Sequence, residues 1–301
     1  MKYKFLGAVA LVVVCGFVLF GCSRPEDDDD KDKATIVTSF YPMYEFTKEI
    51  VGDRFNVVTL VKPGVEPHEF DPSAKDVKKI KKADLVIYNS SSMEKWMTKI
   101  IASDSDKGRF VEAAKGIEMS KGTGEDKNDI DPHVWLSLKL ARQEVANIRD
   151  VLVKKYPKWE LEFNANADLY IQKLDALDHE YRQAFEPAGN KRFVTQHAAF
   201  HYLAEDYGLD MIAISGLSTE EEPSPKKLAE IKKTMTKYNL DIVYTEENVS
   251  SKVAKTLAKE GGYKTVVLNP IESITKKDQE AGENYLEIMR TNLKALKESV
   301  R

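Results

Sequence analysis

The stretch KWELEFNANADLYIQKLDALDHEYRQAF, residues 158–185, decides the fold of this 301-residue chain. Neither proline nor glycine interrupts it, and apolar residues recur at every third or fourth position. That spacing predicts one amphipathic helix, which at about 1.5 Å per residue would be roughly 40 Å long. A helix of this length can cross between two domains as a stiff rod. The apolar series consists of Ala167, Tyr170, Leu174, Leu177 and Tyr181.

Short apolar runs alternate with amphipathic stretches on both sides of this helix. Before it, strands are expected at 35–39, 56–61 and 84–88, and helices at 43–51, 74–82 and 93–101. After it, strands are expected at 192–195, 210–214, 241–244 and 265–268. Ser224 followed by Pro225 predicts the start of a further helix. Alternation of this kind is typical of parallel sheets, so we predict an α/β fold with two parallel-sheet α/β lobes bridged by a single long α-helix.

Composition excludes several classes of protein. The chain is 42% hydrophobic and 31% charged, with a formal net charge of −4, which is ordinary for a globular protein and unlike a disordered or multi-span membrane protein. A chain of this length is expected to form two domains. The sequence has no long basic stripe, so nucleic acid is not an expected partner. Cations are the expected ligands.

The first 22 residues predict a lipoprotein signal. Lys2 and Lys4 form a positively charged start, residues 6–20 are apolar, and Gly21 precedes Cys22. Cleavage after Gly21 would expose Cys22 for acylation, and the lipid would hold the protein on the outer side of the cell membrane. An uncleaved transmembrane anchor is the alternative, because the apolar run is nearly long enough to span a bilayer.

The residues that follow the signal predict an acidic tether. Residues 22–33 include four consecutive aspartates and cannot bury apolar surface. Cys15 lies in the signal, so no cysteine remains beyond the tether, and a metal there must be held by nitrogen and oxygen. The expected divisions are a signal peptide (1–21), the acidic tether (22–33), an N-terminal α/β lobe (34–156), a linking helix (157–188) and a C-terminal α/β lobe (189–301).

Two of the five histidines occupy positions where parallel sheets bind ligands, and a third stands at the start of a predicted helix. His68 and His197 each follow a predicted strand, His133 precedes a helical series, and Glu272 follows the last predicted strand. Ligands of open parallel sheets bind beyond the carboxyl ends of the strands. Each residue alone would more often be an ordinary surface residue. Together, three imidazoles and one carboxylate, two from each lobe, would complete a tetrahedral site for a borderline cation such as zinc.

The other two histidines are not expected to bind the metal. His179 lies within the long helix beside acidic residues and is interpreted as a surface residue. His201 stands four residues after His197 and could face the same way, but the residues between them are typical of packing. The acids close enough in sequence to orient an imidazole ring are Glu66, Glu69 and Asp131.

Several motifs, taken together and in order, resemble a known family. They are SFYPMY at 39–44, EPHEFDPS at 66–73, DPHVWL at 131–136, HAAFHYL at 197–203, and NPIES at 269–273 followed by AGENY at 281–285. This pattern is similar to that of the metal-binding extracytoplasmic solute receptors of ABC importers, the group that serves zinc and manganese. The resemblance covers nearly all of residues 34–301.

The resemblance implies a fold, a site and partners. It implies two α/β lobes with the metal in the cleft between them, held by His68, His133, His197 and Glu272. A histidine at the third position points to zinc (Zn²⁺), while some receptors of this kind take Mn²⁺ or Fe²⁺. The implied partners are a membrane permease and its ATPase. The receptor itself is expected to be a monomer, lipid-anchored to the cell membrane through Cys22.

The predicted function is high-affinity extracytoplasmic capture of zinc and its delivery to an ABC importer. Four protein ligands leave no position for an activated water, which favours capture over catalysis, so no enzymatic activity is expected. Three alternatives stay open. They are a manganese or iron receptor of the same family, a surface adhesin whose metal is structural, and a secreted zinc hydrolase.

Overall fold

The computed structural model describes residues 33–122, 126–219, 223–247 and 250–301. The predicted signal peptide, the predicted acylation site Cys22 and the predicted tether up to residue 32 lie outside these ranges. No helix within the described ranges is both long enough and apolar enough to cross a membrane.

The first sheet has four parallel strands in the order β2-β1-β3-β4. Three of them were expected from the sequence and are confirmed to within two residues at either end. The fourth, β4, was not predicted, because three residues are too few to show an alternating pattern. The strands are β1 (Thr35–Thr38), β2 (Asn56–Thr59), β3 (Leu85–Tyr88) and β4 (Phe110–Glu112).

The second sheet repeats this arrangement, with four parallel strands in the order β6-β5-β7-β8. All four strands are confirmed to within one residue at either end. The strand order reverses between β1 and β3 in the first sheet and between β5 and β7 in the second. Folds of this type bind their ligands at such a reversal. The strands are β5 (Arg192–Thr195), β6 (Asp210–Ala213), β7 (Ile242–Thr245) and β8 (Lys264–Val267).

Three helices belong to the first lobe: α1 (Tyr41–Val51), α2 (Ala74–Lys82) and α3 (Met97–Ser103). Helix α2 has the predicted bounds, and Ser73 and Asp76 form a capping box at its start. Helix α3 begins four residues later than predicted. The carboxylate of Glu94 accepts hydrogen bonds from the backbone N–H groups of Asn89 and Ser90, at 3.0 and 2.9 Å, which holds this segment as a turn.

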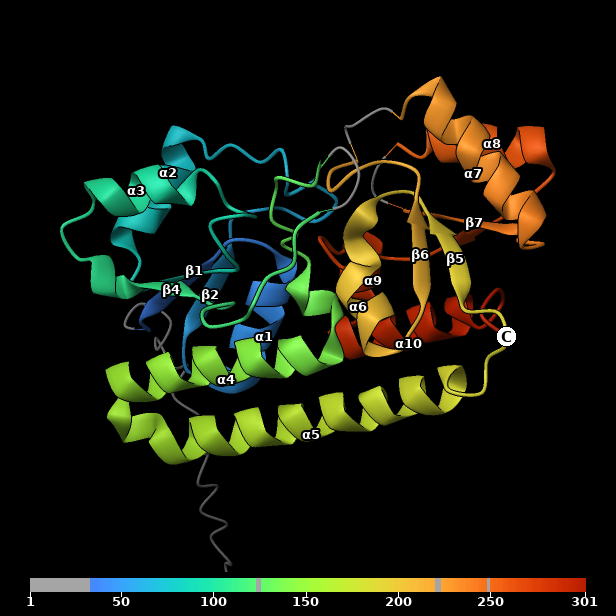
Figure 1. Cartoon of the computed structure of the whole chain (residues 1–301). Coiled ribbons are helices and arrows are strands. Elements are labelled where there is room, and N and C mark those ends of the chain that lie inside the picture. Colours follow the sequence, from blue (N-terminus) through green and yellow to red (C-terminus); the bar gives the residue numbers. More distant parts are fainter. Residues whose placement is uncertain (1–32, 123–125, 220–222, 248–249) are drawn as a thin grey trace, which may run out of the picture. The chain divides into compact units, whose positions relative to one another are not determined.

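Two long helices lie side by side, and the longer one runs beneath both lobes (Figure 1). Helix α4 (Leu138–Lys155) ends in a 3₁₀ turn at Pro157–Trp159, and the chain then returns as α5 (Glu160–Phe185). Helix α5 has 26 residues, so it is about 39 Å long at 1.5 Å per residue. It contacts α1 in the first lobe and α10 in the second, which confirms the predicted bridging helix.

The second lobe contains the remaining helices. Helix α7 begins at the predicted Ser224-Pro225 pair, where the Ser224 hydroxyl accepts a hydrogen bond from the Lys227 backbone at 3.3 Å. The helices are α6 (His201–Asp206), α7 (Pro225–Lys237), α8 (Lys252–Gly261), α9 (Lys276–Glu280) and α10 (Tyr285–Leu296).

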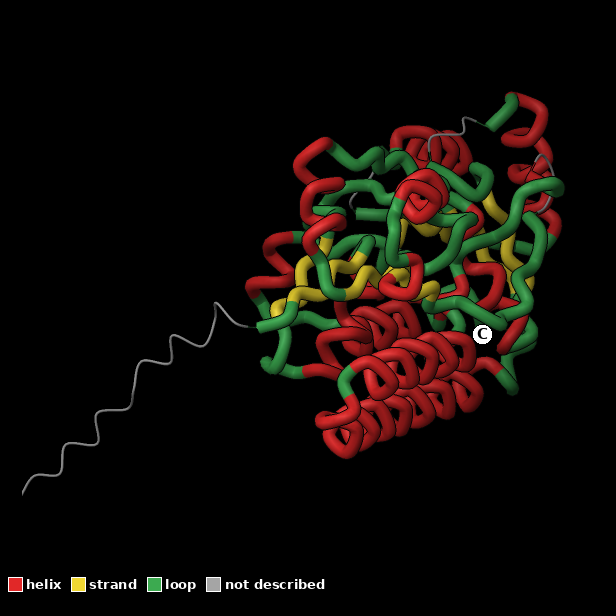
Figure 2. Tube along the Cα trace, turned by 90° about the vertical axis from the view of Figure 1, so that its left-hand side faces the viewer, coloured by secondary structure: helices red, strands yellow, loops and turns green. Residues whose placement is uncertain are grey.

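One hydrophobic core continues through both lobes. Phe46 on α1 makes an edge-on ring contact with Tyr285 on α10, with 5.1 Å between ring centroids. The hydroxyl of Tyr181 on α5 donates to the carbonyl of Met289 on α10 at 2.7 Å. Figure 2 shows the paired long helices as a layer under the strands. The lobes are therefore joined by packed side chains as well as by the chain itself.

Candidate metal centre

The structure brings the four predicted residues together at one point. The Nε2 atom of His68 lies 3.1 Å from that of His133 and 3.3 Å from Oε1 of Glu272. The same Glu272 oxygen lies 3.3 Å from Nε2 of His133 and 3.2 Å from Nε2 of His197. The four potential ligand atoms all lie within 4.8 Å of one another.

Each of these residues reaches the centre from the end of a secondary-structure element. His68 lies in the loop that follows β2, His197 follows β5, and Glu272 follows β8. His133 lies just before the 3₁₀ turn that leads into α4. The carboxyl ends of parallel strands therefore direct three of the side chains to the same point, two residues coming from each lobe.

In two of the imidazole rings, the nitrogen that faces away from the centre lies within hydrogen-bond distance of a carboxylate. Nδ1 of His133 lies 2.7 Å from Oδ1 of Asp131, and Nδ1 of His197 lies 2.6 Å from Oε1 of Glu246. Each carboxylate fixes the protonated nitrogen on the outer side of the ring and leaves Nε2 free to bind a metal. Asp131 was a sequence candidate for this role.

Glu246 was missed by the sequence analysis. It comes directly after β7, so the rule that selected His197 and Glu272 would also have selected it. Among the described residues, neither of the other two sequence candidates bonds an imidazole ring. Glu66 accepts a hydrogen bond from the backbone of His68 at 3.1 Å, and Glu69 lines a neighbouring cavity.

The segment that carries Glu272 is held by hydrogen bonds that are buried or partly buried. The side chain of Asn292 bonds both the backbone N–H and the carbonyl of Asn269, at 2.9 and 2.7 Å. The indole of Trp135 donates to the carbonyl of Pro270 at 2.8 Å. Ile271, fully buried, has φ = 58°, a left-handed conformation that β-branched residues rarely adopt.

Burial and charge shift the pKa values of this group in different directions. Burial would raise the pKa of Glu272, but the nearby imidazoles hold it well below its usual range. Burial would lower the pKa of His133 and His197, but Asp131, Glu246 and Glu272 outweigh it, so both are raised. At His68 burial prevails, and the pKa is lowered. Because a raised pKa favours the protonated ring, protons compete with a metal at His133 and His197.

The donor set suits a particular class of cation. Three imidazole nitrogens and one carboxylate oxygen, with no thiolate, match the preferences of borderline divalent metals. Four donors this close together fit the tetrahedral coordination that Zn²⁺ adopts in closed protein sites. His179 and His201 lie outside this group, since His179 is exposed and bonds Gln183, and the ring of His201 lies against Tyr202.

Comparison with known proteins identifies the family. The sequence model of the family described as zinc-uptake complex component A, periplasmic, matches residues 36–299. The chain belongs to that family. The match confirms the resemblance to metal receptors of ABC importers that the motifs indicate.

Individual relatives agree with this membership. The chain is 45% identical over 304 residues to the zinc-binding lipoprotein AdcA of Streptococcus pneumoniae, covering 97% of this chain and 60% of that protein. It therefore spans about 60% of the length of that relative. It is 41% identical over 317 residues to the high-affinity zinc uptake system protein ZnuA of Bacillus subtilis, covering 99% of this chain and 98% of the relative.

A solved structure shows the same fold. The Zn(II)-bound ZnuA-like domain of Streptococcus pneumoniae AdcA superposes with a TM-score of 0.79 at 47% sequence identity, covering 89% of this chain and 99% of that domain.

Proposed function

We propose that this protein captures zinc outside the cell and delivers it to an ABC importer. The observation that carries the proposal is the convergence of three imidazole nitrogens and one carboxylate oxygen within 4.8 Å. Membership of a zinc-uptake family and similarity to a Zn(II)-bound domain support it. Zinc is the cargo of the protein, and its binding and release are the function.

We propose that His68, His133, His197 and Glu272 are the metal ligands. Burial of His133, His197 and Glu272 keeps water from competing with the metal at these donors. Asp131 and Glu246 increase the basicity of the two rings that they bond. Three nitrogen donors favour zinc over manganese, which prefers sites richer in oxygen.

We propose that the protein is a receptor and not an enzyme. Hydrolytic zinc enzymes keep one coordination position for water or substrate, and here four side chains occupy the tetrahedral set. The named relatives are zinc-binding and zinc-uptake proteins, which is consistent with a receptor.

The proposed organisation follows the sequence. The signal peptide (1–21) is removed, Cys22 carries the lipid, and residues 22–33 connect the membrane to the N-terminal lobe (34–156), the linking helix (157–188) and the C-terminal lobe (189–301). The name lipoprotein, given to one relative, supports the anchor. In this arrangement the receptor acts as a monomer and delivers zinc to a permease that is driven by its ATPase.

Metal content tests the proposed function directly. Protein purified under mild conditions should contain one zinc per chain, and zinc should displace manganese and iron in competition. The matched substitutions are His133→Ala and His197→Ala, which should lose zinc, and His179→Ala, which should retain it. In cells, a deletion strain should fail to grow under zinc limitation, and the His133→Ala gene should not restore growth. Preference for manganese, or zinc binding by both ligand variants, would refute the proposal.

A further inference from the structure

The four candidate ligands differ in how firmly the surrounding structure fixes their side chains. The far nitrogens of the His133 and His197 rings each bond a buried carboxylate. Glu272 follows a backbone that is fixed by Trp135, Asn292 and the left-handed Ile271. A residue can stay in such a conformation only where the surrounding structure determines it strongly. These three donors are therefore in place before a metal arrives.

Two of these donors also belong to one connected unit. Trp135, two residues after His133, donates to Pro270, two residues before Glu272. The hydroxyl of Tyr285 donates to the carbonyl of Trp135 at 2.5 Å and ties the same unit to α10. His133 from one lobe and Glu272 from the other are thus fixed relative to each other.

His68 is held differently. Within the described ranges, its Nδ1 has no carboxylate partner like those of the other two rings. The backbone hydrogen bonds of its loop are local, from Val65 to Lys62 and from Phe70 to Pro67. Its N–H bonds Glu66, two residues away. The loop's side chains contact other segments at Glu66, which accepts from the Thr219 hydroxyl at 3.4 Å, and at Phe70, whose ring lies against Trp96. Neither contact is among the bonds that hold the other three donors, so the loop can move without breaking those bonds.

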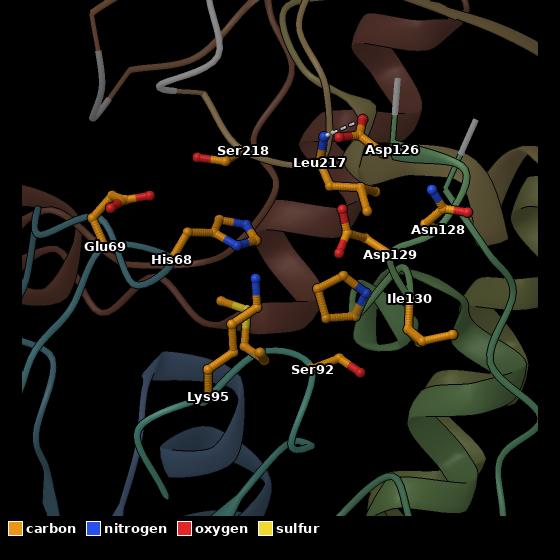
Figure 3. A pocket seen from close by; sticks show the side chains of 12 residues that line it. His68, Glu69, Ser92, Lys95, Asp126, Asn128, Asp129, Ile130, Leu217 and Ser218 are labelled. Carbon is orange, nitrogen blue, oxygen red and sulfur yellow. Dashed lines mark hydrogen bonds between the residues drawn. The ribbon is translucent and has the colours of Figure 1, made fainter. Parts of the chain in front are cut away.

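A cavity of about 280 Å³ reaches the site on the side of His68 (Figure 3). His68 is the one candidate ligand that lines it. The cavity beside Glu272 measures about 10 Å³, which is about the smallest space that can hold one water molecule. The larger cavity is lined by three carboxylates, those of Glu69, Asp126 and Asp129, and by one ammonium group, that of Lys95. Its lining is therefore negatively charged on balance and would attract a cation.

From this asymmetry we infer that His68 is the last ligand to bind the metal and the first to leave it. The inference rests on the proposed zinc-binding function. Zinc enters through the cavity beside His68 and binds first to His133, His197 and Glu272. Movement of the His68 loop then completes the tetrahedral set, and the reverse movement frees one position for a ligand of the acceptor during delivery.

Alanine substitution of each of the three histidines in turn tests the order in which the ligands bind the metal. Zinc affinity and the rate of zinc loss to an excess of chelator are measured on the full protein carrying His68→Ala, His133→Ala or His197→Ala. We expect His68→Ala to retain zinc at least about tenfold more tightly than the other two, a difference of about 1.4 kcal/mol. Its zinc should also dissociate faster than from the wild type. Equal loss of affinity in all three variants would overturn the inference.

A bulky residue in the cavity tests the route. Ser92 lines the cavity and is not a candidate ligand, so Ser92→Trp should slow both zinc binding and zinc release and leave the equilibrium affinity unchanged. Ser103→Trp, at the exposed end of α3, is the matched control and should change neither rate. Unchanged rates in Ser92→Trp would overturn the route through this cavity.

These outcomes separate the inference from the proposed function. If the wild-type protein binds no zinc, the proposed function fails. If the wild type binds zinc and the three alanine variants are equally weak, the proposed function stands and only the binding order is wrong.

Discussion

The residues of the metal centre differ in how readily their roles can be predicted from the sequence. His68, His133, His197 and Glu272 could be selected because each stands at the start or end of a predicted element and because the residue types suit one metal. Glu246 occupies an equivalent corner, but glutamates at strand ends are common in soluble proteins. Its role depends on the distance of 2.6 Å to His197, which the pairing of β5 with β7 creates.

Glu246 supplies the first prediction at the scale of the residue. Glu246→Gln keeps the shape of the side chain and removes the charge that holds Nδ1 of His197. We expect zinc affinity to fall about 10-fold to 100-fold, the usual effect of losing such a partner. Titration against a zinc-binding dye measures the loss. Glu247→Gln, one position further and exposed, serves as the control, and an equal effect of both substitutions would contradict the role of Glu246.

A second prediction concerns two buried acids away from the metal centre. Burial raises the pKa of Glu144 well above its usual value, and burial raises the pKa of Glu94 to about 7. A carboxyl group whose pKa is higher in the folded state stabilises the protein at pH values below the unfolded pKa. That contribution is lost as the pH rises through the folded pKa. The free energy of unfolding should therefore fall between about pH 5 and 8.

Glu144→Gln tests this pH dependence. Asn89 donates to Glu144 at 3.0 Å, and a glutamine oxygen can accept the same bond without carrying a charge. Urea unfolding of the variant should show a smaller decrease in stability from pH 6 to pH 8 than the wild type shows. Glu118→Gln, at an exposed position, should retain the wild-type pH dependence. An unchanged dependence in Glu144→Gln would contradict the assignment.

The bounds of some helices and strands can be predicted from the local sequence, because capping residues and apolar spacing determine them. Helix α2 has the predicted bounds because its capping residues and apolar spacing agree, and β3 and β7 are nearly continuous apolar runs. Strand β4 depends on its pairing with β3, and the late start of α3 depends on the bonds that Glu94 makes to Asn89 and Ser90. Such features are set by tertiary contacts, which a single sequence does not display.

The link between the His133 and Glu272 segments gives a prediction at the scale of the element. Trp135→Phe keeps an aromatic ring in the core and removes the donor to the carbonyl of Pro270. A buried carbonyl left without its partner costs about 1–3 kcal/mol, so the free energy of unfolding should fall by that amount. Zinc affinity should fall as well, because Glu272 becomes less fixed.

Trp96→Phe is the matched control for this substitution. Trp96 is half-buried beside Phe70, and no donation from its indole to the metal-binding segments is present among the described residues. It should leave zinc affinity at the wild-type value. Calorimetry gives affinity, and chemical unfolding gives stability. A Trp135→Phe protein that loses stability and retains full zinc affinity would show that the link supports the fold alone.

At the scale of the whole described region, the way the lobes are joined limits how they can move. The core continues from α1 through α5 to α10, and Tyr181 and Tyr285 bond across it. A wide hinge motion would have to separate these packed side chains, whereas movement of the loop at His68 would not. Close-packed interiors resist gradual deformation, so binding should rearrange loops and leave the lobes in place.

Small-angle scattering and hydrogen exchange test this conclusion together. The radius of gyration of the metal-free protein should equal that of the zinc-loaded protein within error, because the long helix and the shared core keep the lobes at a fixed separation. Hydrogen exchange should slow on zinc binding in the loop between β2 and α2, where His68 becomes anchored, and should change little along α5. A measurable decrease in the radius of gyration on loading would show closure of the lobes. If exchange instead slowed equally in the segments of His68, His133 and Glu272, all three would become ordered on binding, and the preformed set of three donors would be wrong.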